Sequence, residues 1–92
     1  MIRSFRNRDT RALYEGRYVR RFDSFASQAE RRLQILDSAT TLRDLASLPS
    51  NRFEALLGER KGQDSIRINQ QWRICFEWRL DGPHNVEIVD YH

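Results

Sequence analysis

The stretch WRICFEWR, residues 72–79, alternates large apolar side chains with polar or small ones. A period of two is typical of a β-strand that buries one face. The four apolar side chains are expected to face the core, whereas the opposite face presents Arg73. This stretch therefore predicts a strand at the centre of an antiparallel sheet.

Segments on both sides of this strand predict the rest of the sheet. Residues 65–69 (SIRIN) carry β-branched isoleucines, and the Asn69-Gln70 pair at the end of this segment suits a hairpin turn. The expected strands are residues 53–57, 65–69, 72–79 and 85–91. The expected turns are residues 58–62, 69–70 and 81–83.

Helical patterns dominate the first half of the chain. Apolar residues recur every three or four positions from Phe22 to Leu36 and predict a helix over residues 23–38, capped by Asp23 or Ser24. A shorter helix is expected over residues 41–47, where Thr41 and Asp44 resemble a capping box and Pro49 ends the run. Residues 1–5 suggest a short edge strand, and Leu13 to Tyr18 a weak helix. This order predicts a single α+β domain over residues 1–92.

Composition narrows the function only partly. The net charge is +3, and arginine supplies every one of the 16 basic residues except Lys61. Guanidinium groups suit a nucleic-acid partner, but a GC-rich genome or a solvated face would give the same bias. The lone Cys75 excludes an internal disulfide, and no Cys/His cluster has metal-ligand spacing. We expect a cytoplasmic protein without metal or cofactor, because no apolar run is long enough to cross a bilayer or to act as a secretion signal.

The polar residues offer one constellation suited to RNA cleavage. Arg73 lies on the polar face of the central strand, and Asp90, Tyr91 and His92 end the neighbouring one. A histidine suits proton transfer near neutral pH, an arginine offsets charge on a phosphorane, and a tyrosine can stack on a base. From the residues alone, a surface role stays open for each of them; Arg73, for example, can pair with Glu77 or Glu87.

A resemblance to a known family covers almost the whole chain. FEALLGERKGQDSIRINQQWRICFEW (residues 53–78) and NVEIVDYH (residues 85–92) resemble the HigB killer proteins of the RelE/ParE superfamily, and residues 1–16 resemble the start of those proteins. The resemblance implies a RelE-like fold, with helices packed on a curved antiparallel sheet of about four to five strands. It also implies a type II toxin that cleaves mRNA in the ribosomal A site without a metal. A HigA-like helix-turn-helix antitoxin would neutralise it and link it to operator DNA.

The same resemblance assigns roles to residues at matching positions. Arg73 would stabilise the transition-state phosphate, and His92 would be the best candidate for proton transfer within a terminal group that includes Asp90 and Tyr91. RNA or ribosomal RNA backbone would be held by Arg60, Lys61 and Arg67.

This chain departs from the family pattern at three positions. Leu57 stands where a lysine is common, Glu54 where some members have histidine, and Asp64 where an aromatic residue is frequent. These departures predict an attenuated enzyme. They also leave two alternatives open: a ParE-like module directed at gyrase, and a toxin that only binds its antitoxin and DNA.

Overall fold

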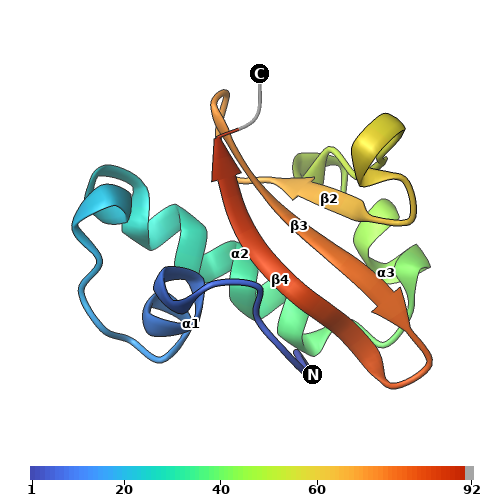
Figure 1. The fold of residues 1–92 in the computed structure, drawn as a ribbon. Coiled ribbons are helices and arrows are strands. Elements are labelled where there is room, and N and C mark those ends of the chain that lie inside the picture. Colours follow the sequence, from blue (N-terminus) through green and yellow to red (C-terminus); the bar gives the residue numbers. More distant parts are fainter. Residues whose placement is uncertain (91–92) are drawn as a thin grey trace.

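Helices cover one face of a four-stranded antiparallel sheet in a computed structural model of the chain (Figure 1). The structure describes residues 1–90. The strands, in sheet order, are β1 (Glu54–Ala55), β2 (Asp64–Arg67), β3 (Trp72–Arg79) and β4 (Gly82–Asp90). The α-helices are α1 (Arg8–Tyr14), α2 (Ala26–Ser38) and α3 (Leu42–Ala46), and the 3₁₀ helices are η1 (Arg20–Phe25), η2 (Pro49–Asn51) and η3 (Gly58–Arg60). The predicted α+β class is confirmed.

The core lies between α2 and the sheet. Ile66, Ile74 and Ile88 pair in register across β2, β3 and β4, and all three are buried. They pack in one cluster with Leu33 and Leu36 of α2. The alternation along residues 72–79 therefore separates a helix-covered face from an outward face, as predicted.

The long helix begins differently from the prediction. A 3₁₀ helix precedes it, and the α-helical part starts at Ala26, so neither Asp23 nor Ser24 caps it. The N-cap position is Phe25, which makes no side-chain capping bond. A 3₁₀ helix has three residues per turn and places Phe22 and Phe25 on the same side. Both rings are buried against Trp72, at centroid distances of 5.8 and 4.8 Å.

The predicted capping box of the short helix is confirmed. The Oγ1 of Thr41 accepts from the backbone N–H of Asp44, and the Asp44 carboxylate accepts from the backbone N–H of Thr41. The helix ends at Ala46, ahead of Pro49. The weak helix expected near Leu13 also exists, but it begins earlier, at Arg8, where the side chain of Asn7 caps it.

The bounds of three expected strands were wrong in detail. The strand expected over residues 53–57 is reduced to Glu54–Ala55, and the one expected over residues 65–69 spans Asp64–Arg67. The charged turn expected over residues 58–62 is present and contains a 3₁₀ helix. Gly82 and Pro83 belong to β4, so the β3–β4 turn is made by residues 80–81. Gly82 has a φ of +124°, and a Cβ there would lie 2.7 Å from the carbonyl oxygen of Met1. This close approach of the N-terminal segment explains why glycine occupies a strand position.

The N-terminal segment runs beside β4 without forming the expected strand. It makes a single parallel bridge, between Phe5 and Val86. The Arg3 N–H donates to the Pro83 carbonyl, and the Val86 N–H donates to the Ser4 carbonyl. The segment therefore covers the outer edge of β4, as Figure 1 shows. Among the described residues, no helix has the length and apolarity needed to cross a membrane.

Candidate active site

Two arginines lie side by side on the outward face of the sheet. Arg67 of β2 and Arg73 of β3 are direct antiparallel partners. Their side chains share a face, because their neighbours Ile66 and Ile74 both point into the core. Like charges directly opposite each other are destabilising, and an anion between them relieves the repulsion. The pair is thus placed to bind a phosphate.

Arg73 is held in one orientation by its surroundings. Its Nε donates to the Oγ of Ser65 at 2.8 Å, and its Nη2 donates to the carbonyl oxygen of Arg52. Ser65 is fully buried, and Arg52 lies in a left-handed turn with a φ of +45° that ends η2. The guanidinium is therefore fixed by groups that leave its positive charge uncompensated, since neither partner is an anion.

The β2–β3 turn completes a groove around these arginines. The Oδ1 of Asn69 accepts from the N–H groups of Gln71 and Trp72, both at 2.8 Å, and the carbonyl oxygen of Asn69 accepts from Nε of Arg67 at 3.0 Å. The groove has a volume of about 410 Å³. It is lined by Arg52, Phe53, Glu54, Arg67, Asn69, Gln70 and Arg73.

The two departures noted at positions 54 and 57 differ in their relation to the groove. Glu54 lies in β1 and lines the groove, so it brings a carboxylate to the same hollow as the two arginines. Leu57 is 82% exposed and does not line it. Asp64 pairs with Phe76, on the helix-covered face, where burial raises the pKa of its carboxyl group.

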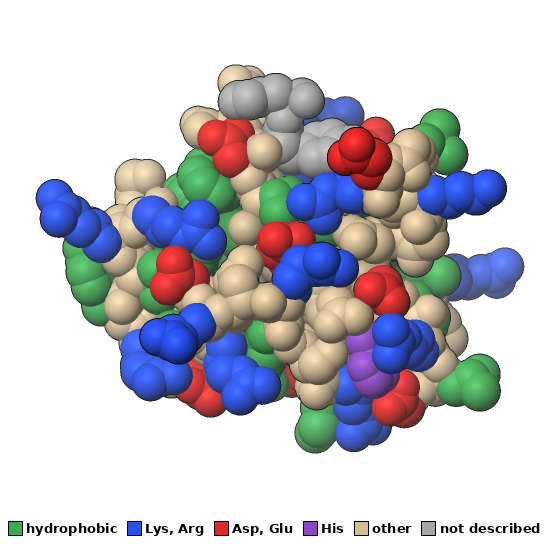
Figure 2. Space-filling view, viewed as in Figure 1, with side chains coloured by type: hydrophobic (Ala, Val, Ile, Leu, Met, Phe, Trp, Pro, Cys, Tyr) green, Lys and Arg blue, Asp and Glu red, His purple; other side chains and the backbone are tan. Residues whose placement is uncertain are grey.

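Arg60 and Lys61, the other two residues predicted to hold the RNA backbone, do not line the groove. Arg60 is half-buried and donates to Gln63 at 3.1 Å and to Glu87 at 3.2 Å. Glu87 also lies 3.7 Å from the Nε of Arg6, so an Arg–Glu–Arg cluster crosses the sheet face. Figure 2 shows blue and red side chains meeting at the middle of this face. Lys61 is exposed, one residue further along.

Asp90 ends β4 opposite Trp72, on the helix-covered side, whereas Val89 pairs with Arg73. Its carboxylate accepts from Nε2 of Gln71 at 2.9 Å, which ties the end of β4 to the β2–β3 turn beside the groove. It is not among the groove-lining residues. The predicted residues Tyr91 and His92 lie outside the described residues.

The single cysteine is buried and has an unreactive thiol. Cys75 pairs with Glu87 beneath the Arg–Glu–Arg cluster and is 1% exposed. Burial, reinforced by Glu87, outweighs the nearby arginines and raises the pKa of the thiol to about 11. The thiol is therefore protonated at neutral pH and is a poor nucleophile. Within residues 1–90, no group of His, Cys, Asp and Glu side chains is arranged to hold a metal ion.

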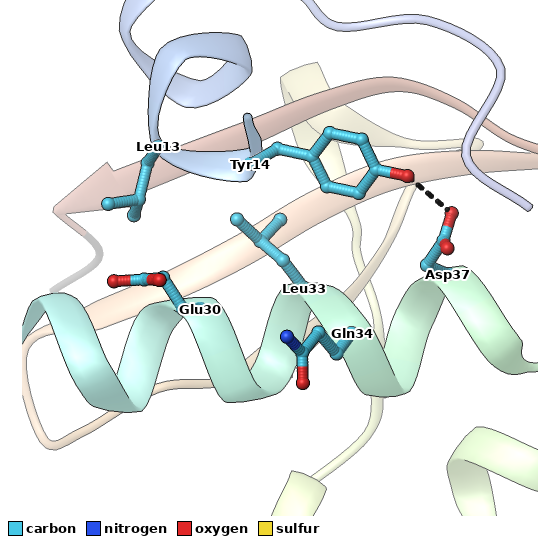
Figure 3. A pocket seen from close by; sticks show the side chains of 6 residues that line it. All are labelled: Leu13, Tyr14, Glu30, Leu33, Gln34 and Asp37. Carbon is cyan, nitrogen blue, oxygen red and sulfur yellow. Dashed lines mark hydrogen bonds between the residues drawn. The ribbon is translucent and has the colours of Figure 1, made fainter. Parts of the chain in front are cut away.

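A second hollow, between α1 and α2, has different chemistry (Figure 3). It has a volume of about 240 Å³, and the Tyr14 hydroxyl donates to the Asp37 carboxylate at 3.0 Å on its wall. Burial, followed by this hydrogen bond, raises the pKa of Tyr14. Its charged lining residues, Glu30 and Asp37, are acidic, so this hollow does not suit an RNA phosphate.

Sequence reasoning found Arg67, Arg73 and Glu54 in the groove and missed four of its lining residues: Arg52, Phe53, Asn69 and Gln70. Asn69 carried a signal, because a turn asparagine often binds the backbone two residues ahead. Arg52 carried none, since its role depends on a carbonyl oxygen that any residue supplies.

The fold and the groove define a small α+β protein with two neighbouring arginines in a surface groove. A family model described as the RelE-like toxin of the type II toxin–antitoxin system HigB matches residues 3–92. Toxin HigB-1 of Vibrio cholerae serotype O1 is 47% identical over 62 residues, which cover 67% of this chain and 64% of that protein. Endoribonuclease HigB of Proteus vulgaris is 30% identical over 95 residues, which cover both chains completely. The chain belongs to the HigB-like family of RelE-like toxins, whose partner is an antitoxin.

Proposed function

We propose that this toxin is an endoribonuclease that cleaves mRNA in the ribosomal A site of the cytoplasm and is neutralised by a HigA-like antitoxin. The antitoxin would also connect it to operator DNA. The observation that carries the proposal is the groove in which Arg67 and the anchored Arg73 lie side by side. Family membership and the name of the Proteus relative support the same activity.

The proposed reaction is an internal transesterification of RNA, in which side chains of this chain move the protons. The 2′-oxygen attacks the adjacent phosphorus and loses its proton to a base, while the P–O5′ bond breaks and the 5′-oxygen takes a proton from an acid. The products are a 2′,3′-cyclic phosphate and a free 5′-hydroxyl. Negative charge grows on the phosphorane oxygens, and Arg73 offsets it with a charge that is already in place.

Proton transfer is assigned to the end of the chain. His92 is the proposed proton-transfer residue, because an imidazole titrates near neutral pH. Asp90 would serve as the base or orient His92, and Tyr91 would stack on a base of the message. The hydrogen bond between Asp90 and Gln71 supports this placement, since it holds the end of β4 beside the groove.

The remaining basic residues would hold the RNA backbone. Arg67 supplies a second charge inside the groove, and Lys61 supplies an exposed one beside η3. Arg60 contributes less in the free toxin, because Glu87 compensates its charge. Such backbone contacts orient an enzyme without specifying sequence.

A translation extract tests the proposal, with mRNA 5′ ends mapped by primer extension. Wild type is expected to produce ribosome-dependent cuts at in-frame codons, and Arg73→Ala and His92→Ala to lose them by about a hundredfold or more. Arg79→Ala is the matched control, because Arg79 ends the same strand, away from the groove, and pairs with Glu77. Equal cutting by wild type and Arg73→Ala would overturn the assignment.

One observation favours a second candidate, a toxin that binds its antitoxin without cleaving RNA. Glu54 places a carboxylate in the groove and opposes the phosphate-binding charge there. In the same extract, a folded wild type that leaves mRNA intact would support this alternative. Broken DNA in cells with intact mRNA would instead indicate a gyrase-directed toxin.

A further inference from the structure

A second concentration of positive charge lies on α1, η1 and the segment between them. Blue side chains gather over these N-terminal elements at the left of Figure 2. They surround a hollow of about 510 Å³, which we call the N-terminal basic hollow. It is lined by Arg8, Asp9, Ala12, Arg17, Tyr18, Val19, Arg20 and Arg21, and none of these residues lines the groove of Arg73.

The positive charge of this hollow is only partly compensated. Arg21 pairs with Asp9 at 2.9 Å, and Arg17 pairs with Glu15. Arg8 and Arg20 are exposed, and within residues 1–90 neither forms an ion pair. Four arginines therefore face one carboxylate in the lining, which is the balance expected of a surface that binds a polyanion.

An aromatic side chain stands beside these charges. Tyr18 is 72% exposed, although a tyrosine ring carries a large apolar surface. It lies between Arg17 and the 3₁₀ helix that begins at Arg20. A cationic groove with an exposed ring is the arrangement by which proteins hold single-stranded nucleic acid, with phosphates on the cations and a base on the ring.

We propose that the N-terminal basic hollow is a second RNA-binding surface, which takes a single-stranded segment with its phosphates on Arg8 and Arg20 and a base stacked on Tyr18. The surface is separate from the groove of Arg73, since α1 and β2 lie on different sides of the molecule in Figure 1. The proposal does not depend on that groove being the site of cleavage.

The lining is less suited to a protein partner. Arginine is enriched at protein interfaces as well, but the centre of such an interface is apolar, whereas half of this lining is arginine. Its apolar residues other than Tyr18 are Ala12 and Val19, which are small and half-buried. An acidic protein segment would gain charge contacts here but no apolar anchor.

Binding of a labelled 2′-O-methyl oligouridine, measured by fluorescence anisotropy, tests the proposal on the whole protein. The methyl group blocks the 2′-oxygen, so the probe cannot be cleaved by attack of that oxygen. Arg8→Gln/Arg20→Gln is expected to weaken binding about tenfold and to reduce the salt slope by about 1.4, at roughly 0.7 for each lost phosphate contact. Arg31→Gln/Arg43→Gln removes the same charge from exposed positions on α2 and α3 and is the matched control.

Stacking is tested separately from charge. Tyr18→Ala is expected to weaken binding about tenfold, whereas Tyr18→Phe keeps the ring and the affinity. Arg73→Ala should retain the part of the binding that depends on Arg8 and Arg20. Circular dichroism of each variant confirms that it is folded.

Two outcomes would overturn the proposal. The first is equal loss of affinity in Arg8→Gln/Arg20→Gln and in Arg31→Gln/Arg43→Gln, which would show that net charge alone matters. The second is binding of an oligoglutamate peptide as tight as that of the RNA probe, with the same dependence on Arg8 and Arg20. That result would assign the hollow to an acidic protein segment.

Discussion

The guanidinium of Arg73 is held in a fixed orientation before any anion binds. Arg73 contacts Ser65 and the carbonyl oxygen of Arg52 through different nitrogens of its planar guanidinium. A lysine has one nitrogen and cannot hold both partners in the same geometry. The neighbouring Arg67 adds a like charge that raises the free energy of the empty groove. A phosphate that enters the groove relieves this repulsion.

Leu57→Lys is predicted to raise the rate of mRNA cleavage, by up to about a hundredfold, because it supplies the cation that the resemblance to the HigB pattern implies at this position. Leu57 is 82% exposed, so the replacement requires no repacking. The measurement is the initial cleavage rate in the translation extract. Leu80→Lys, at an even more exposed position in the β3–β4 turn, is the control. An unchanged rate in Leu57→Lys would contradict the prediction.

Cys75 is predicted to make the protein less stable at alkaline pH. The thiol has a pKa of about 11 in the folded protein, above its ordinary value of 9.0. The unfolded chain therefore loses this proton first, and the free energy of unfolding falls as pH rises between the two values. The expected loss is roughly 1 kcal/mol between about pH 8.5 and about pH 10.

Urea unfolding of wild type and Cys75→Ala across that pH range measures the effect. Cys75→Ala is expected to show a smaller decline in the free energy of unfolding, because it lacks the thiol. Tyrosine titration, including that of Tyr14, contributes equally to both proteins. Parallel declines would show that the thiol is not the cause.

At the scale of elements, α1 is fastened to the sheet by a buried hydroxyl. Thr10 is fully buried, and its Oγ1 accepts from the backbone N–H of Ile88 at 3.1 Å. This hydrogen bond joins the first α-helix to the last strand, 78 residues apart in the sequence. It also satisfies a buried N–H of β4 that would otherwise be costly.

Thr10→Val is predicted to lower the free energy of unfolding by about 1–3 kcal/mol, because it leaves the Ile88 N–H buried and unpaired. Thr10→Ser keeps the hydroxyl and should lose less, although it removes a methyl group. Chemical denaturation of the three proteins measures the difference. A Thr10→Val protein as stable as wild type would show that water or another group satisfies the N–H.

At the scale of the whole molecule, the N-terminal segment connects α2 to the edge of β4. The Asp37 carboxylate of α2 accepts from the Ile2 N–H at 2.8 Å and from the Tyr14 hydroxyl (Figure 3). The segment between these two contacts covers the edge of β4. One acidic side chain thus links the first residues, α1 and α2.

Asp37→Ala is predicted to loosen this segment without unfolding the core. Hydrogen exchange at the N–H groups of Arg6 and Val86 should rise about tenfold, because they bond between the segment and β4. The N–H of Ile74, within the core strand, is the internal control. Equal increases at all three sites would indicate global destabilisation instead.

Much of the fold was predictable because local patterns and tertiary packing agree. The period-two stretch at residues 72–79 and the capping box of Thr41 and Asp44 appear in the structure as predicted. Predictions were wrong where distant groups intervene. Gly82 and Pro83 look like a turn but extend β4, because the N-terminal segment packs against them.

The candidate site was predictable as a set of residue types but not as an arrangement. Arg73 could be identified from the polar face of an alternating strand, whereas Arg67, its partner in the sheet, was implied only by the family resemblance. The compensation of Arg60 by Glu87, and the tie between Asp90 and Gln71, could not be identified, because each joins positions far apart in the sequence. The roles of Tyr91 and His92 remain predictions that rest on the family pattern.

The sequence by itself determined the α+β class, the buried face of the sheet and the basic, arginine-rich composition. These follow from periodicity and residue type, which are local properties of the chain. Only the tertiary structure decided that Arg73 is anchored by Ser65 and Arg52, that Glu54 enters the groove and that a second basic hollow lies on α1 and η1. The physical reason is that strand register and helix packing bring distant residues together, and the pattern within each segment does not specify these pairings.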